Sequence, residues 1–165
     1  TCMDLGNPSF IGKRQQHLYC IAETSVDFTA KSDKEKAGLI IFQDEKHFYY
    51  LCKSVDQGKA VVQLFKSSTD NSMKMELLTQ AALTTEKLLL RISAEGEQYS
   101  FSYADKQLNW ILLKDKVDGT FLSSQVANSF IGCVFGMYAT STGEASSNKA
   151  SFKYLTYTGN DPMYK

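Results

Sequence analysis

The chain has 165 residues, which fits one domain, and its 18 basic and 18 acidic residues give a formal net charge of zero. No basic cluster is longer than Lys13-Arg14, so the chain lacks the charge pattern of proteins that bind nucleic acids or anionic membranes. No stretch approaches the roughly 18 apolar residues of a membrane span, and the first six residues do not resemble a signal peptide.

The first predicted strand covers residues 18–28, where apolar and polar side chains alternate with a period of two. We expect one face to be buried, formed by Leu18, Cys20, Ala22, Val26 and Phe28. The other face carries Glu23, Ser25 and Asp27. The polar residues 31–36 predict a loop.

Two strands follow at residues 37–43 and 47–52, and the turn Asp44-Glu45-Lys46 between them predicts a hairpin. After a second turn at Gln57-Gly58-Lys59, residues 60–66 form the next predicted strand. Residues 67–72 are polar and predict a loop. The apolar positions of residues 73–80 fit either a strand or a helical turn.

The second half of the chain predicts further strands at residues 87–94, 98–103, 109–114, 132–140 and 150–158. Glu95-Gly96-Glu97 is a tight hairpin signal between the first two of these. Residues 115–129 are the least regular stretch, and residues 141–148 predict a polar loop. About nine or ten strands without a long amphipathic helix predict one all-β domain, a sandwich or a barrel.

The four cysteines are Cys2, Cys20, Cys52 and Cys133, which are far apart and form no CxxC pair, so the sequence indicates no zinc site. Cys20 and Cys52 lie in apolar runs, where we expect small buried side chains. Their spacing leaves the disulfide state open. No cofactor is predicted, although oxygen ligands for calcium would be compatible with the sequence.

Catalytic patterns are missing from the predicted strands. A retaining glycosidase needs two carboxyl groups about 5 Å apart. The adjacent acids, Asp44 with Glu45 and Glu95 with Glu97, lie in turns and indicate solvated hairpin tips. The two histidines, His17 and His47, accompany no nucleophile motif, so we interpret both as structural polar residues.

Aromatic side chains on a surface could stack on the apolar face of a sugar ring. The candidates for such a platform are Trp110, Tyr103, Tyr49 and Tyr50. Period-two counting places about half of such residues in the core. We retain Trp110 and Tyr103 as candidates for sugar stacking.

Three segments together resemble a known family: PSFIGKRQQH at residues 8–17, EKAGLIIFQDEKHFYYL at 35–51 and NSFIGCVFGMYATS at 128–141. They are similar to the C-terminal concanavalin A-like domain of family 43 glycoside hydrolases, the β-xylosidase and α-L-arabinofuranosidase group. The segment SFKYLTYTG at 151–159 resembles the closing strand of that domain. The resemblance implies a jelly-roll type sandwich of two curved antiparallel sheets over residues 1–165.

In that family the domain follows a five-bladed propeller, which carries three catalytic acids. The resemblance implies that this chain is a non-catalytic accessory domain of a glycosidase that degrades xylan, xylo-oligosaccharides or arabinoxylan. Its partner would be the propeller of the same parent chain. The resemblance also implies that Ser129, Phe130, Ile131 and Gly132 reach the mouth of the propeller's pocket, where Phe130 would wall off the substrate.

Two departures from the family pattern lead to further expectations. Family domains begin some tens of residues upstream, so we expect an outer strand to be missing and the unpaired edge to favour association. Lys153 stands where the family carries an acid. Two other functions fit an isolated sandwich: a free-standing lectin-like carbohydrate-binding module, and a small hydrolase with a close carboxylate pair in a groove.

Overall fold

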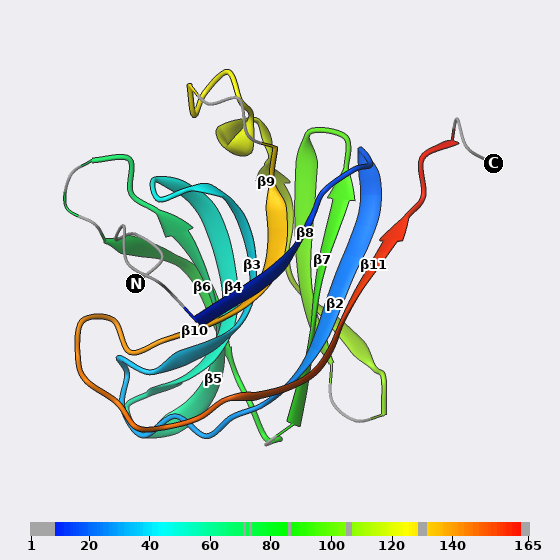
Figure 1. Cartoon of the computed structure of the whole chain (residues 1–165). Helices are drawn as coiled ribbons and strands as arrows, with labels where there is room; N and C mark the ends of the chain where they lie inside the picture. The colour runs from blue at the N-terminus through cyan, green and yellow to red at the C-terminus, as the bar shows by residue number, and fades with distance from the viewer. Residues whose placement is uncertain are drawn as a thin grey trace.

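The protein is described here by a computed structural model, which covers residues 9–70, 72, 74–85, 87–104, 107–128 and 132–162. These residues form a β-sandwich of two antiparallel sheets (Figure 1). The strands are β1 (Ser9–Arg14), β2 (Tyr19–Asp27), β3 (Lys36–Asp44), β4 (His47–Asp56), β5 (Lys59–Ser67), β6 (Met75–Ala82), β7 (Lys87–Glu95), β8 (Gln98–Ala104), β9 (Trp110–Asp118), β10 (Val134–Thr140) and β11 (Ser151–Gly159). One 3-10 turn, η1 (Thr120–Leu122), follows β9.

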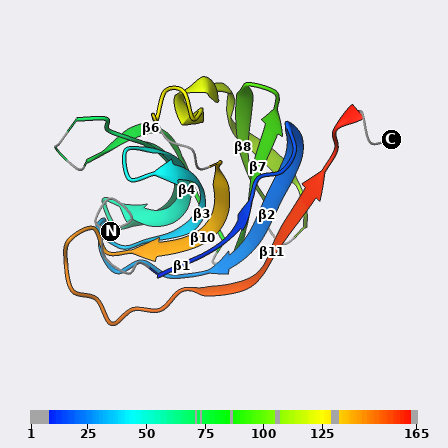
Figure 2. The same cartoon turned by 45° about the horizontal axis from the view of Figure 1, so that its top comes forward.

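The six-stranded sheet has the order β1-β10-β3-β4-β5-β6, and the five-stranded sheet has the order β11-β2-β7-β8-β9. Hairpins join β3 through β6 and β7 through β9, whereas β1 pairs with β10 and β2 pairs with β11 across most of the chain. Figure 2 shows the six-stranded sheet curling around itself. No helix in the described part of the chain is long and apolar enough to cross a bilayer.

The main core lies between the two sheets. It is built from alternate residues of the facing strands, such as Ala22 and Val26 on β2 and Leu90 and Ile92 on β7, each of which is fully buried. Tyr49 and Phe101 meet in this layer with their rings edge to face, 5.8 Å apart. The apolar and polar residues of these strands alternate because every second side chain points into the core between the sheets.

A second apolar cluster fills the other face of the six-stranded sheet. Its buried members are Ile40, Phe48, Tyr50, Cys52, Phe65 and Tyr138. The Tyr50 hydroxyl donates to the backbone carbonyl of Tyr138 at 3.0 Å, so its polar atom is satisfied. Because β3 and β4 are buried on both faces, their sequences are continuous apolar runs instead of alternating ones.

The all-β sandwich and its hairpins are confirmed, with several corrections. Residues 75–82 form a strand, and β1 is a strand that the pattern did not predict. The prediction for Leu18 was wrong, since β2 begins one residue later and Leu18 is 65% exposed. Ser25, predicted on the polar face, is buried. The predicted burial of Cys20 and Cys52 is confirmed, and both are free thiols.

Candidate functional site: a polar cleft at one end of the sandwich

A cleft of about 510 Å³ opens at one end of the sandwich. It lies between the β1–β2 connection, the β7–β8 turn and the segment that follows β9. These three parts come together at the top of Figure 1, whereas the long β10–β11 connection crosses the opposite end. Gly132 and Cys133, which immediately precede β10, also line the cleft.

Gln15 fastens the β1–β2 connection to the body of the domain. Its backbone N–H donates to the carbonyl of Cys133 at 2.9 Å, and its Nε2 donates to the carbonyl of His17 at 3.0 Å. Its Oε1 accepts a 2.8 Å hydrogen bond from the hydroxyl of Tyr99, a largely buried residue on β8. The backbone of Gln15 thus joins the corner to the residue that precedes β10, and its amide side chain joins the corner to β8.

His17 is held by Tyr157 on β11. The Tyr157 hydroxyl oxygen accepts from the N–H groups of Gln16 at 2.8 Å and His17 at 3.1 Å, and it lies 3.0 Å from Nδ1 of His17. The Tyr157 hydroxyl therefore contacts the backbone of the corner at two positions and the imidazole of His17 at a third. The imidazole packs so closely on Gly159 that a Cβ there would lie 2.4 Å from the ring. His17 thus holds the β1–β2 corner against β11.

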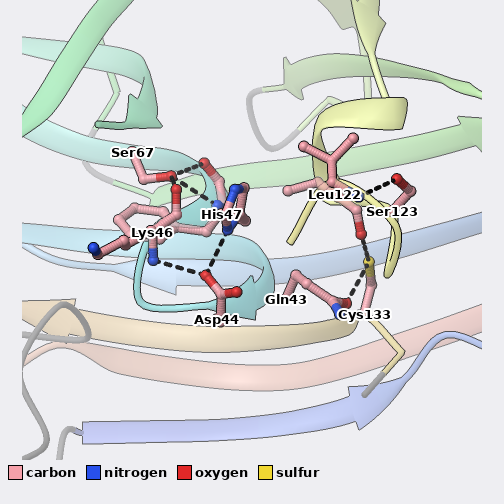
Figure 3. A network of polar contacts seen from close by, with 10 residues as sticks. Gln43, Asp44, Lys46, His47, Ser67, Leu122, Ser123 and Cys133 are labelled. Carbon is pink, nitrogen blue, oxygen red and sulfur yellow. Dashed lines mark hydrogen bonds and ion pairs between the residues drawn. The ribbon is translucent and has the colours of Figure 1, made fainter. Parts of the chain in front are cut away.

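A second group of polar contacts lies partly in the cleft lining and partly around the turn between β3 and β4 (Figure 3). The Sγ of Cys133 is 3.4 Å from both Oε1 of Gln43 and the backbone carbonyl of Leu122. Burial raises the pKa of this thiol to about 11. His47 places Nδ1 2.8 Å from Oδ1 of Asp44, which confirms that this histidine also makes structural contacts.

The carboxylates that line the cleft are those of Glu97 and Asp161. Asp161 Oδ1 accepts the backbone N–H of Tyr19 at 2.7 Å, so this carboxylate helps to fix the start of β2. The thiol of Cys133 bonds to an amide and a carbonyl, and its raised pKa opposes the thiolate form that a nucleophile needs. Over the residues that the structure describes, no group of three or more His, Cys, Asp or Glu side chains could hold a metal ion.

Two apolar side chains at the opening of the cleft are exposed among polar neighbours. Leu18 is 65% exposed and Val126 is 52% exposed, and both line the opening. Single exposed apolar residues are common on protein surfaces, so these two alone do not mark an interface. The geometry therefore offers hydrogen bonds and apolar contact.

The structure brings together two of the segments that carried the family resemblance. A Cβ built on Gly132 would lie 3.5 Å from a guanidinium nitrogen of Arg14, so the end of the NSFIG sequence stands beside the RQQH sequence. Ser129, Phe130 and Ile131 lie outside the described residues. No motif in the sequence links Glu97 to Asp161. Glu97 lies in the β7–β8 turn and Asp161 follows β11, and β2 stands between β11 and the β7–β8 hairpin in the five-stranded sheet.

The two sugar-stacking candidates lie away from the cleft, on the five-stranded sheet. The guanidinium of Arg91 sits 3.7 Å from the ring centroid of Trp110, and Arg91 in turn forms a 2.5 Å ion pair with Glu23. Tyr103 packs, partly buried, against the main core. Their role in sugar stacking remains a prediction. The same idea was wrong for Tyr49 and Tyr50, which are at most 1% exposed.

Comparison with known proteins places the chain in a family. The sequence model for the β-xylosidase C-terminal concanavalin A-like domain, GH43_C2, matches residues 1–158. The chain belongs to this family. The predicted concanavalin A-like sandwich is thereby confirmed, and this GH43 C-terminal domain occupies the C-terminal part of its longer relatives.

Two relatives illustrate the match. The non-reducing end α-L-arabinofuranosidase BoGH43B of Bacteroides ovatus is 29% identical over 151 residues, covering 92% of this chain and 28% of the relative. The xylosidase/arabinosidase of Butyrivibrio fibrisolvens is 28% identical, with the same two coverages. The GH43 domain therefore spans somewhat less than a third of the length of these enzymes.

Solved structures agree with the fold. The structure described as Bacteroides ovatus xyloglucan PUL GH43B superposes with a TM-score of 0.84 at 30% identity, covering 93% of this chain and 30% of that one. The xylan β-1,4-xylosidase of Bacillus halodurans superposes with a TM-score of 0.85 at 21% identity, covering 95% of this chain and 31% of that one. At that identity, the second match supports the fold alone.

Proposed function

We propose that this domain is the non-catalytic accessory part of a xylosidase or arabinofuranosidase and packs on the catalytic propeller of the same parent chain. In this proposal it contributes the segment Ser129, Phe130, Ile131 and Gly132 to the mouth of the active site. The parent enzyme would act on xylo-oligosaccharides or arabinoxylan, and this domain would need no cofactor. Family membership and the names of the longer relatives support the general assignment.

The observation that carries the finer proposal is the juxtaposition of Gly132 with Arg14 at the cleft. Gly132 is the described member of the segment that the family resemblance assigns to the active-site mouth. The same end of the sandwich carries the exposed side chains of Leu18 and Val126. Packing on a catalytic domain would remove both from water and orient the segment toward the substrate.

The lining of the cleft also supports an accessory role. Gln15 and His17 use their hydrogen-bonding atoms to hold neighbouring backbone and side chains, as Asp161 does with one carboxylate oxygen. Groups fixed in this way build a rigid surface. A catalytic pair would instead need a base in contact with a nucleophile, and Cys133 bonds to Gln43 and to the Leu122 carbonyl.

A free-standing sugar-binding module would need an exposed aromatic platform. On the curled face of the six-stranded sheet, Phe48 and Tyr138 are closed off from solvent, and Phe10 and Phe42 are partly buried against the same cluster. On the other sheet, Arg91 covers one face of the Trp110 ring. These contacts favour the accessory role.

Kinetics on three proteins test the proposal: the isolated domain, the parent enzyme, and the parent with residues 1–165 deleted. We expect no turnover of nitrophenyl xyloside or arabinofuranoside by the isolated domain and full activity in the parent. In the parent, Phe130→Ala should raise KM, whereas Leu77→Ala, which truncates an exposed apolar residue on β6, should not.

Two results would contradict the proposal. Turnover by the isolated domain would assign catalysis to this sandwich. Calorimetric binding of xylohexaose by the isolated domain would instead support the free-standing module, and Arg91→Ala, which uncovers Trp110, is the variant that would then identify the binding face.

A further inference from the structure

One wall of the cleft is formed by the segment from Gly119 to Val126, which has little regular structure of its own. Two of its side chains nevertheless point inward: Phe121 is 7% exposed and Leu122 is 2% exposed. Both belong to the single 3-10 turn η1. A loop that buries two large apolar side chains is held by tertiary packing in addition to its hydrogen bonds.

The ring of Phe121 sits among three side chains of the six-stranded sheet. Its centroid lies 5.1 Å from that of His47 and 5.5 Å from that of Tyr49. The ammonium of Lys66 lies 4.0 Å from the ring centroid, which is the geometry of a cation–π contact. Residues from β4 and β5 thus form a socket for an aromatic side chain that arrives after β9.

Polar contacts hold the segment on the N-terminal side of Phe121. Asp118 Oδ1 accepts from the backbone N–H of Thr120 at 2.9 Å and from its hydroxyl at 2.6 Å. The Tyr49 hydroxyl donates to the carbonyl of Asp118 at 2.8 Å, and the N–H of Gly119 donates to the carbonyl of Glu97 at 2.7 Å. The segment is therefore tied to both sheets before the aromatic anchor.

Beyond the anchor, the described hydrogen bonds are mostly local. The N–H groups of Val126 and Ala127 both donate to the carbonyl of Ser123, at 3.1 and 2.9 Å. The N–H groups of Leu122 and Ser123 donate within the turn to the carbonyls of Gly119 and Thr120, at 3.0 and 2.9 Å. The contact that leaves the segment is the weak one from the thiol of Cys133 to the Leu122 carbonyl. The position of most of this wall therefore depends on the contacts that hold the side chains of Phe121 and Leu122.

We propose that Phe121 is a positioning residue. Its ring, held by His47, Tyr49 and Lys66, sets the place of residues 119–128 and so the shape of the cleft wall that meets the catalytic domain. The effect on catalysis rests on the proposed function. The anchoring itself does not, and the two can be tested separately.

Hydrogen exchange on this chain tests the anchoring. Phe121→Leu keeps an apolar side chain but loses the ring contacts, and we expect exchange at the amides of Leu122, Ser123, Val126 and Ala127 to quicken at least tenfold. The matched control is Phe101→Leu, a fully buried ring that contacts the same Tyr49 from β8. After correction for the loss of global stability, the exchange rates of these four amides should be the same in the control as in the wild type.

Two further variants keep the test decisive if Phe121→Leu folds poorly. Lys66→Met removes only the ammonium and should quicken exchange at the same amides by a smaller factor, about threefold. Phe121→Tyr keeps the aromatic ring, so exchange at these amides should stay at the wild-type rate. If these amides respond no more to Phe121→Leu and Lys66→Met than to Phe101→Leu, the anchor is overturned.

Kinetics of the parent enzyme then test the consequence. A displaced wall weakens ground-state and transition-state binding equally, so Phe121→Leu should raise KM several-fold with kcat within twofold. Phe101→Leu should leave KM unchanged, because KM does not depend on how much of the enzyme is folded. Faster exchange with an unchanged KM would confirm the anchor and contradict the proposed function of this end of the sandwich.

Discussion

The thiol of Cys133 lines the cleft, yet the structure makes it a poor nucleophile. Burial raises its pKa to about 11, from 9.0 for a free cysteine. At pH 8 the thiolate fraction, and with it alkylation by iodoacetamide, should be about 100-fold lower than for a free thiol. Peptide-resolved mass spectrometry would measure the rate at this position.

Cys52 and glutathione are the two references for that measurement. Cys52 is fully buried and its pKa is raised to about 12, so it should react still more slowly than Cys133 in the folded chain. In urea, both thiols should react at the rate of glutathione. A Cys133 that reacts at the glutathione rate without denaturant would contradict the burial that the structure assigns to it.

Glu35 helps to hold the long β10–β11 connection on the body of the domain, at the end of the sandwich opposite the cleft. Its carboxylate accepts from the N–H of Lys31 at 2.7 Å, from the Ser146 hydroxyl at 2.6 Å and from Asn148 Nδ2 at 2.7 Å. These hydrogen bonds hold the pKa of Glu35 below its usual value. Glu35→Gln would replace an acceptor with an amide NH₂ and should lower the free energy of unfolding at pH 7 by about 1–3 kcal/mol.

The pH dependence of that difference has a definite sign. A carboxyl whose pKa is lower in the folded than in the unfolded chain stabilises the fold above its unfolded pKa, and this contribution is lost as the pH falls through its folded pKa. The stability gap between wild type and Glu35→Gln, measured by urea unfolding, should therefore shrink below about pH 4.5. Glu95→Gln, at an exposed position, should show no comparable gap at any pH.

At the scale of the strands, Gly38 marks the closest approach of β3 and β4. A Cβ at this position would lie 2.1 Å from the carbonyl oxygen of Leu51 and 2.6 Å from the Cα of Cys52. Both obstacles are backbone atoms of the neighbouring strand, so relief requires the ladder to open. Gly38→Ala should cost about 3 kcal/mol of unfolding free energy.

The control for this substitution is Gly58→Ala in the β4–β5 turn. Gly58 has φ of +76° and nothing within 4 Å of a built Cβ, so only backbone strain of about 1 kcal/mol should appear. Chemical denaturation of both variants measures the difference. A Gly38→Ala protein as stable as Gly58→Ala would show that β3 and β4 are not so closely packed.

Strands with a clear physical signature were predictable from the sequence. β2, β7 and β8 alternate because one face is buried, and β3 and β4 are apolar runs between turns because both faces are buried. β1 was missed because it is an edge strand with mostly exposed side chains. Its presence depends on hydrogen bonds to β10, which lies more than 100 residues later.

The site was only partly predictable for the same reason. The resemblance identified the RQQH corner, and Gly132 does lie beside it. The irregular stretch after β9 gave no sign that Phe121 is an anchor, because the socket is made by His47, Tyr49 and Lys66 from distant strands. Likewise, Asp161 reaches the cleft only because β11 pairs with β2.

For the whole molecule, the two edges of the six-stranded sheet, β1 and β6, are where we expect copies of the chain to meet. Among the described residues, β1 pairs on one side only, with β10, and its Ile11 is 68% exposed. A strand edge with an exposed apolar residue and backbone N–H and C=O groups that face no neighbouring strand is a template for pairing with another chain. The isolated domain should therefore associate as its concentration rises.

Ile11→Lys tests this expectation, because a charge on an edge strand opposes pairing without removing any buried contact. Sedimentation velocity should show that the wild-type domain shifts toward dimer at high concentration and that the variant stays monomeric. Leu77→Lys places the same charge on β6, the opposite edge of the sheet, where the apolar residue is 43% exposed. If Leu77→Lys abolishes association and Ile11→Lys does not, copies meet through β6. A wild-type domain that stays monomeric throughout would show that the β1 edge is already blocked.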